Sequence, residues 1–177
     1  MLTLRQEQTR DYQIVFDLIQ AAFKDEPLSD HSEGALVDRL RKADTFISEL
    51  SIVAELDAQI VGHILLTPIT IAAEAQQVPA LALAPVSVLP AFQKRGIGGR
   101  LIEEAHRVAV TLGHQIVALI GHEHYYPRFG YQMAHTFNIA FPFEVPNENA
   151  LVVELVPGAL DDVSGMVVYP NAFFDPS

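Results

Sequence analysis

Cysteine is absent from this chain of 177 residues. Its absence excludes disulfide bonds, thiolate metal ligands and any covalent mechanism through sulfur. Basic residues are also scarce, because 11 lysines and arginines stand against 22 aspartates and glutamates, and the formal net charge is −11. This balance argues against nucleic-acid binding, which needs a basic face to neutralise phosphates. An acidic protein instead favours cationic small molecules such as amines.

Long apolar runs are missing as well. No stretch reaches the roughly 18 residues that a membrane helix needs, and the N-terminus has no apolar signal core. We therefore expect no membrane partner and a cytoplasmic location. Half of the residues are hydrophobic and the mean hydropathy is +0.22, which indicates a folded globule. With no repeat or linker in the sequence, we expect one domain over residues 1–177, burying roughly 70% of its unfolded surface.

The most informative stretch is Val86–Leu101, where a strand-like apolar run meets a basic, glycine-rich turn that opens a helix. Glycines let the backbone approach an anion, and the N–H groups of a first helical turn can bind phosphate oxygens. Lys94, Arg95 and Arg100 add three positive charges within seven residues. Basic side chains at a helix N-terminus oppose the helix dipole unless an anion is bound. The stretch therefore predicts a site for a pyrophosphate.

Spacing separates the known kinds of phosphate-binding turn. The P-loop pattern is absent, because no Lys-Ser or Lys-Thr follows a glycine at the required distance. The dinucleotide fingerprint begins at Gly96 and Gly98 but has Leu101 where its third glycine belongs. What is present is Gln-x-x-Gly-x-Gly at residues 93–98, preceded by Val-x-Val-x-Pro at residues 86–90. This arrangement resembles the acetyl-CoA loop of the GCN5-related N-acetyltransferases, the GNAT family.

The resemblance implies that acetyl-CoA is a co-substrate and that no metal is used. In the family, backbone groups of the strand bind the pantetheine arm and the glycine-rich turn binds the pyrophosphate. Gln93 stands where many relatives carry arginine, at a position that mainly shapes the loop. The implied coenzyme-binding residues are Val86, Ser87, Val88, Gln93, Lys94, Arg95, Gly96, Ile97, Gly98, Gly99 and Arg100.

A second motif lies at residues 121–131, with the sequence GHEHYYPRFGY. It resembles the Tyr-x-x-x-Gly-aromatic element of the same family, with Tyr126 as the tyrosine. Its longer form is similar to a subgroup of predicted N-acetyltransferases of unassigned substrate. The resemblance implies direct attack of a neutral amine on the acetyl thioester. A phenol with a pKa of about 10 stays protonated at neutral pH and is close to a thiol in acidity, so Tyr126 suits the general acid that protonates the leaving thiolate.

A structural role for Tyr126 is the alternative, since its ring could simply pack beside Phe129 and Tyr131. Tyr125 is the weaker candidate and could line the substrate side. With the first motif present, we favour the functional interpretation of Tyr126.

Several residues are candidates for the base that deprotonates the amine. The resemblance favours Glu33, because the subgroup carries a glutamate near the start of the second helix. Residues 30–33 also have the form of a capping box, a structural role that explains Glu33 fully and that we favour. His122, Glu123 and His124 are further candidates, because they lie close to the motif tyrosine in sequence and a histidine titrates in the useful pH range. The alternative is that these three residues form a solvated turn. A metal site there would need ligands from elsewhere, and the family uses no metal.

Apolar periodicity and turn residues predict the elements. Pro85 cannot donate to a sheet ladder, so the apolar strand around it should break or bulge and free the backbone of Val86 and Val88. The expected fold is the α/β acetyltransferase fold, a mixed, mainly antiparallel sheet splayed at a central strand bulge, with helices on both faces. The expected elements include strands at 2–5, 51–56, 59–66 with an extension to 73, 80–89, 115–120, 131–139, 151–155 and 167–169, a helix capped by Thr9 and a helix over 97–112.

We expect an acetyl-CoA-dependent N-acyltransferase that acts on a small-molecule amine or a protein amino group. One alternative is a non-catalytic acyl-CoA sensor on the same fold. Another is a dinucleotide-binding oxidoreductase, which would bind NAD(H). We expect no such binding for this chain. The paired Phe173 and Phe174 near the C-terminus should dock on the domain itself or on a second subunit, which leaves a homodimer open.

Overall fold

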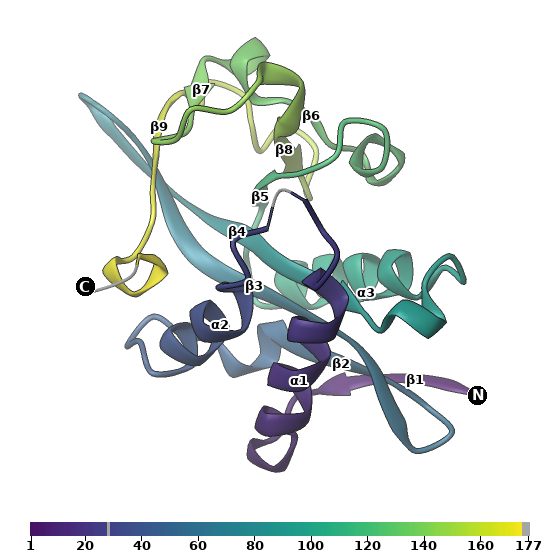
Figure 1. Ribbon diagram of the computed structural model, residues 1–177. Helices are drawn as coiled ribbons and strands as arrows, with labels where there is room; N and C mark the ends of the chain where they lie inside the picture. Colours follow the sequence, from purple (N-terminus) through teal and green to yellow (C-terminus); the bar gives the residue numbers. More distant parts are fainter. Residues whose placement is uncertain (28, 175–177) are drawn as a thin grey trace. The chain divides into compact units, whose positions relative to one another are not determined.

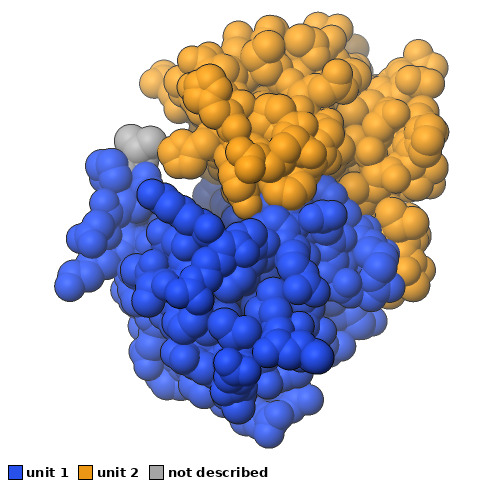
Figure 2. Space-filling view, turned by 90° about the vertical axis from the view of Figure 1, so that its right-hand side faces the viewer, with its two compact units in different colours: residues 1–67, 84–108, 171–177 blue, residues 68–83, 109–170 orange. Residues whose placement is uncertain are grey.

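The computed structural model describes residues 1–27 and 29–174. The chain divides into two compact units, coloured separately in Figure 2. The first comprises residues 1–67, 84–108 and 171–177, and the second comprises residues 68–83 and 109–170. Three elements contribute residues to both units: strands β3 (Gln59–Ala73) and β4 (Gln76–Val88) and helix α3 (Ile97–Thr111). None of the described helices has the length and apolar character needed to cross a bilayer.

The first unit begins with strand β1 (Leu2–Gln6), helices α1 (Tyr12–Phe23) and α2 (Glu33–Arg41) and strand β2 (Ser51–Leu56), all labelled in Figure 1. Strands β1 and β2 are antiparallel, as are β2 and β3. The turn between β2 and β3, which follow the strands expected at 51–56 and 59–66, is a two-residue hairpin. Asp57 and Ala58 both have positive φ, 50° and 69°, as a type I′ turn requires.

Helices cover both faces of this part of the sheet, as predicted. Val53 on β2 belongs to the cluster that α1 and α2 bury, and it is paired with His63 on β3. The next residue, Gly62, faces the other side because side chains alternate along a strand. A Cβ on Gly62 would lie 3.0 Å from Leu101 Cδ1 of α3, so a glycine permits the close approach of this helix. The core of the α1–α2 face consists of Val15, Leu18, Ile19, Val37, Leu40, Val53, Ile60 and Leu65.

The second unit contains strands β5 (Ile116–Ile120), β6 (Gln132–Met133), β7 (Ile139–Ala140), β8 (Ala150–Glu154) and β9 (Gly165–Val168). Strand β5 is parallel to β4 and antiparallel to β8. The strand order is β1-β2-β3-β4-β5-β8-β6, with β9 paired to β3 and β7 paired to β9. The prediction of a mixed, mainly antiparallel sheet is therefore confirmed.

The single strand predicted for residues 131–139 is wrong. The segment forms the two-residue β6, a 3-10 turn at Ala134–Phe137 and then β7. Thr136 Oγ1 donates to Met133 O at 2.7 Å, which closes the turn locally. Asn138 ends the turn in the left-handed region, with φ 57°. Side chain-to-backbone hydrogen bonds of this kind compete with a sheet ladder, and here they prevail over the apolar pattern.

Thr9 is not the cap of the first helix. A 3-10 turn at Thr9–Asp11 precedes α1, and Gln8 is the capping residue of that turn. The Gln8 backbone N–H donates to Asp11 Oδ2 at 2.8 Å, and the same carboxylate binds the Arg5 guanidinium at 2.7 Å. Asp11, the last residue of this turn, thus stabilises the backbone before α1 by accepting the Gln8 N–H.

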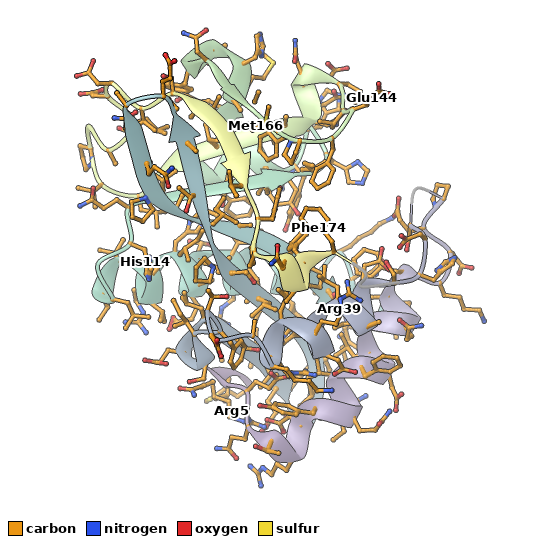
Figure 3. All side chains as sticks on the ribbon, turned by 90° about the vertical axis from the view of Figure 1, so that its left-hand side faces the viewer. Arg5, Arg39, His114, Glu144, Met166 and Phe174 are labelled. Carbon is orange, nitrogen blue, oxygen red and sulfur yellow. The ribbon has the colours of Figure 1, made fainter. Side chains whose placement is uncertain are left out.

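Of the two C-terminal phenylalanines, Phe173 docks on the first unit itself, whereas Phe174 is exposed. Residues Asn171–Phe173 form a 3-10 turn, and Phe173 packs against the core cluster of α1 and α2. Arg39 Nε donates to Ala172 O at 3.1 Å, and Figure 3 labels Arg39 and the neighbouring Phe174. This outcome is one of the two that the sequence predicts.

Candidate active site

The glycine-rich turn leads from the end of β4 into α3. After a 3-10 turn at Pro90–Phe92, Lys94 and Gly96 both take positive φ, 64° and 80°. Helix α3 begins at Ile97, and Arg100 N donates to Gly96 O at 3.1 Å. The N–H groups of residues 97–99 therefore precede the first intrahelical hydrogen bond and can bind a ligand.

Gln93 ties this turn back to the strand. Its side-chain Nε2 donates to Val88 O at 3.0 Å, while Phe92 N donates to Leu89 O at 2.8 Å. Both bonds are short-range, so the turn and the end of β4 form one local structure. A side-chain amide is well suited to this bond because it offers a donor without adding a charge.

Three cations surround the turn. Lys94, Arg95 and Arg100 are exposed, and none forms an ion pair with an acidic side chain among residues 1–27 and 29–174. The Arg95 guanidinium lies 5.2 Å from the centroid of the Phe92 ring, a cation–π distance. Uncompensated positive charge at a helix N-terminus is the electrostatic environment that favours a bound polyanion.

Strand β4 runs through Pro85 without a break, and the irregularity lies in its pairing with β5. That pairing comprises only Leu81 with Val117 and Ala82 with Ala118 in the described part of the chain. Beyond it, Leu89 N still donates to Val61 O of β3 at 2.9 Å. Within the first unit, residues 84–88 consequently have a strand neighbour on the β3 side only. Within that unit their other backbone edge has no paired strand, and the binding of the pantetheine arm along it stays a prediction.

Tyr126 lies in the second unit, on a 3-10 turn at Tyr126–Phe129. Its ring packs edge to face with Tyr125 and Tyr131, with centroids 5.1 and 5.8 Å away. Burial raises the pKa of the Tyr126 phenol well above its ordinary value, with a smaller contribution from Tyr125. The packing role considered for this residue is therefore real. It leaves the hydroxyl group without a hydrogen-bond partner among the described residues.

The charged residues before Tyr126 form a solvated turn. His122 and His124 are exposed, and the nearest acid–base pair joins His124 Nε2 to Glu123 Oε1 at 3.5 Å. The described residues contain no group of three or more potential ligands that could bind a metal ion. Arg128 Nε donates to Tyr125 O at 2.9 Å, which stabilises the turn that follows.

The capping box predicted for residues 30–33 is wrong. Helix α2 begins at Glu33 with Ser32 as the capping residue, and Ser32 makes no side-chain capping bond. Asp30 Oδ1 instead accepts from Ser32 N at 3.0 Å, and Glu33 accepts from Ser29 Oγ at 2.6 and 2.8 Å. Ser29 lies four residues before Glu33, and its hydroxyl group, rather than a backbone N–H of the capping residue, binds the Glu33 carboxylate. The structural role that we favoured for Glu33 therefore does not apply.

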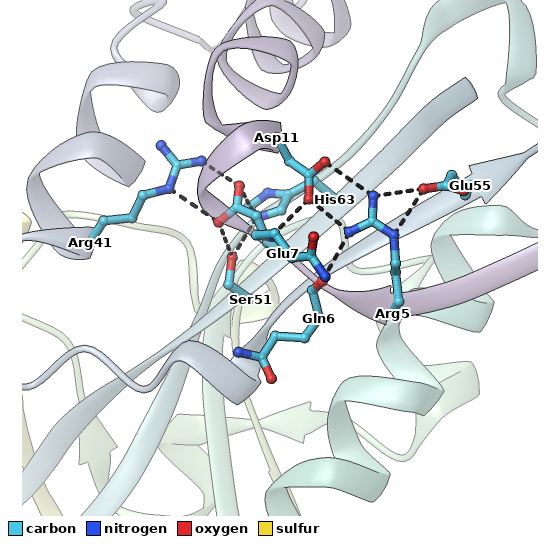
Figure 4. A network of polar contacts seen from close by, with 9 residues as sticks. Arg5, Gln6, Glu7, Asp11, Arg41, Ser51, Glu55 and His63 are labelled. Atoms are coloured by element: carbon cyan, nitrogen blue, oxygen red, sulfur yellow. Dashed lines mark hydrogen bonds and ion pairs between the residues drawn. The ribbon is translucent and has the colours of Figure 1, made fainter. Parts of the chain in front are cut away.

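A buried polar network in the first unit is not predicted by the sequence (Figure 4). Arg41 Nε donates to Glu7 Oε1 at 3.1 Å, and Ser51 Oγ donates to the same oxygen at 2.8 Å. His63 Nε2 lies 2.9 Å from Ser51 Oγ. Because the serine proton is directed at the glutamate, His63 must donate through Nε2. These four residues come from separate segments, so no local pattern could reveal them.

His63 should make the protein less stable in mild acid. Burial, with the Arg41 charge second, lowers the pKa of His63 from 6.5 to about 3. Above pH 6.5 the residue is neutral in both folded and unfolded chains and adds no pH dependence. Below it only the unfolded chain binds the proton, so the free energy of unfolding falls by about 1.4 kcal/mol per pH unit. Urea unfolding at pH 7.5, 6.5 and 5.5 measures this slope, which His63→Gln should reduce; equal slopes would contradict the assignment.

Comparison with known proteins places this geometry among acetyltransferases. The family described as "Acetyltransferase (GNAT) domain" matches residues 3–134. An uncharacterized N-acetyltransferase of Escherichia coli K12, YjhQ, is 35% identical over 118 residues, which is 66% of this chain and 65% of that protein, so the chain spans just under two thirds of this relative.

Two solved structures share the fold. A GNAT-family acetyltransferase from Brucella melitensis, solved in complex with acetyl-CoA, has a TM-score of 0.80 and 33% identity, and the match covers 98% of this chain and 99% of that one. The E. coli N-acetyltransferase YhbS, solved in complex with CoA, has a TM-score of 0.87, with 99% and 93% covered. At 24% identity this second likeness supports the fold alone.

Proposed function

This chain belongs to the GNAT acetyltransferase family, and we propose that it transfers an acetyl group from acetyl-CoA to a primary amine. One observation carries the proposal. The turn at residues 93–100 combines open helix N–H groups, left-handed backbone at Gly96 and three cations without acidic partners among the described residues. A cytoplasmic location and a single domain over residues 1–177 belong to the same proposal.

The residues present fit the coenzyme. In the proposed complex the N–H groups of Ile97, Gly98 and Gly99 bind the pyrophosphate, with Lys94, Arg95 and Arg100 supplying charge. The free backbone edge of Val86, Ser87 and Val88 binds the pantetheine arm. The bound coenzyme supplies the acetyl group as a thioester, which is activated toward an amine. Backbone geometry and charge in the first unit support this proposal for the implied residues.

In the proposed mechanism Tyr126 is the general acid. The amine nitrogen bonds to the acetyl carbon, the carbon–sulfur bond breaks, and its electron pair leaves on sulfur. Tyr126 Oη donates its proton to that sulfur, and the proton lost by the amine restores the phenol through a base or solvent. The raised pKa keeps the phenol protonated at working pH, but it also makes the phenol a weaker acid than the thiol, so the close match in acidity expected from the sequence does not hold in the free protein. Glu33, His122, Glu123, His124 and a water chain are all open as the base.

An amine screen tests the proposal directly. The protein is titrated with acetyl-CoA by calorimetry and then assayed for thiol release with a polyamine, an aminoglycoside, an amino acid derivative and a peptide amino terminus. We expect acetyl-CoA binding and amine-dependent thiol release. Binding without release for any amine would support the non-catalytic sensor. No binding of acetyl-CoA would overturn the proposal altogether.

Gly98→Ile should weaken acetyl-CoA binding by about 10- to 100-fold, since a branched side chain at the helix N-terminus keeps phosphate oxygens from the amides. Glu103→Ile is the matched control, because it places the same side chain at an exposed position of the same helix. Calorimetry measures both affinities, and thermal unfolding verifies that each variant is folded. Parental affinity in Gly98→Ile would contradict the assigned pyrophosphate site.

A further inference from the structure

The ring of Tyr126 rests on the bare backbone of Gly121. Gly121 directly follows β5, and a Cβ placed on it would overlap Tyr126 Cε2 and lie 3.0 Å from Cδ2. Tyr125 and Tyr131 contact the same ring edge to face. The ring is therefore held by a glycine backbone and by two aromatic neighbours, and any side chain at residue 121 would displace it.

Asn149 holds Gly121 in place through both of its backbone groups. Gly121 N donates to Asn149 O at 2.9 Å, and Asn149 Nδ2 donates to Gly121 O at 3.0 Å. The ladder between β5 and β8 pairs Ile120 with Ala150, so these bonds extend it by one residue.

In a regular antiparallel ladder the second bond would come from the backbone N–H of Asn149. That N–H instead donates to Pro146 O at 2.9 Å, within the turn before β8. The side-chain amide takes its place, which explains why an asparagine is suited to this position.

We propose that Gly121 and Asn149 are positioning residues for the Tyr126 hydroxyl, an inference that rests on the proposed role of Tyr126 as general acid. Proton transfer requires the donor oxygen within hydrogen-bond reach of the accepting sulfur. Displacement of a reacting group by about 1 Å can cost about 100-fold in rate. The two hydrogen bonds between Asn149 and Gly121, which form a clamp on Gly121, fix the backbone under the ring. The orientation of the ring in turn fixes the position of the hydroxyl group.

Two variants test the proposal by different routes. Gly121→Ala pushes the ring aside. Asn149→Asp keeps the side-chain shape but, when ionised, has no donor for Gly121 O. Each should lower kcat for thiol release by about 10-fold or more and leave the KM for acetyl-CoA within about twofold. Asn147→Asp, an exposed position in the same 3-10 turn, is the matched control and should retain the parental kcat. Thermal unfolding reports whether each variant is folded. If Gly121→Ala is not folded, Asn149→Asp alone tests the proposal.

The assay uses the amine of the screen that gives the fastest thiol release, or water as acceptor if none exceeds hydrolysis. Both variants are repeated in a Tyr126→Phe background. Residues that act through the hydroxyl should add little to the loss already caused by Tyr126→Phe. A full further loss in that background, or a parental kcat in both single variants, would overturn the positioning role. If Tyr126→Phe alone leaves kcat unchanged, the general acid itself is refuted, and the two failures are thereby distinguished.

Discussion

Replacing Tyr126 by phenylalanine is expected to lower kcat for acetyl transfer by about 100-fold. The phenyl ring keeps the edge-to-face contacts with Tyr125 and Tyr131, so only the proton donor is lost. Without it, the thiolate must leave unprotonated or wait for a proton from solvent. Because the ring contacts are retained, the affinity for acetyl-CoA should stay within about twofold of the parent. Steady-state thiol release gives kcat, and calorimetry gives the affinity.

Tyr125→Phe is the matched control for this experiment. Tyr125 is the adjacent phenol, and burial raises its pKa as well. Its substitution should change kcat by less than about threefold, since the motif assigns the donor to the other tyrosine. The pH profile adds a second check. Because the pKa of Tyr126 is raised above the ordinary value of 10.0, its ionisation should produce no alkaline loss of kcat below pH 10. Parental turnover in Tyr126→Phe would remove this residue from the mechanism.

Local signals predict the parts of this molecule that local chemistry determines. The turn at Asp57 and Ala58 separates two alternating runs and closes as a two-residue hairpin. Gly113 ends α3 in the left-handed region, with φ 92°, as a C-terminal glycine should. The glycine-rich turn at residues 93–98 is likewise set by residues close in sequence, and its helix begins where the motif places it. In each case the spacing of a few residues is enough.

Other features depend on which of several partners a polar side chain takes, and sequence alone does not decide this. Residues 30–33 have the letters of a capping box, but Ser29 supplies the hydroxyl that binds Glu33. Thr9 is a good capping residue, yet Asp11 receives the Gln8 N–H and the Arg5 side chain instead. The competing bonds are all local and similar in energy, so the spacing of the residue types does not select between them.

The clamp on Gly121 shows the same limit near the candidate site. The motif identifies Tyr126, but Asn149 lies more than twenty residues away and has no pattern of its own. Its role follows only from the pairing of β5 with β8. A sequence can therefore indicate the reacting group while leaving unspecified what positions it.

The buried network of the first unit concentrates charge where water is excluded. Glu7 is 6% exposed and the Arg41 side chain 4% exposed. The guanidinium binds the Glu7 carboxylate through two nitrogens and also binds Asp38. It lies 4.1 Å from the centroid of the Tyr12 ring, which adds a cation–π contact. Among the described residues, its removal would leave the buried Glu7 carboxylate with the Ser51 hydroxyl as its hydrogen-bond donor and with His63 Nε2 at 3.9 Å.

Arg41→Ala is consequently expected to lower the free energy of unfolding by about 3–5 kcal/mol, the cost of an unpaired buried charge. Arg39→Ala is the matched control from the same helix. Its guanidinium binds two backbone carbonyls, of Ala172 and Phe173, so the expected loss is about 1–2 kcal/mol. The double variant Glu7→Gln with Arg41→Met removes both charges, keeps most of the volume and should recover more than half of the loss. Urea unfolding at pH 7.5 measures all three. Equal losses in the two arginine variants, or no recovery in the double variant, would show that packing rather than the ion pair sets the stability of this network.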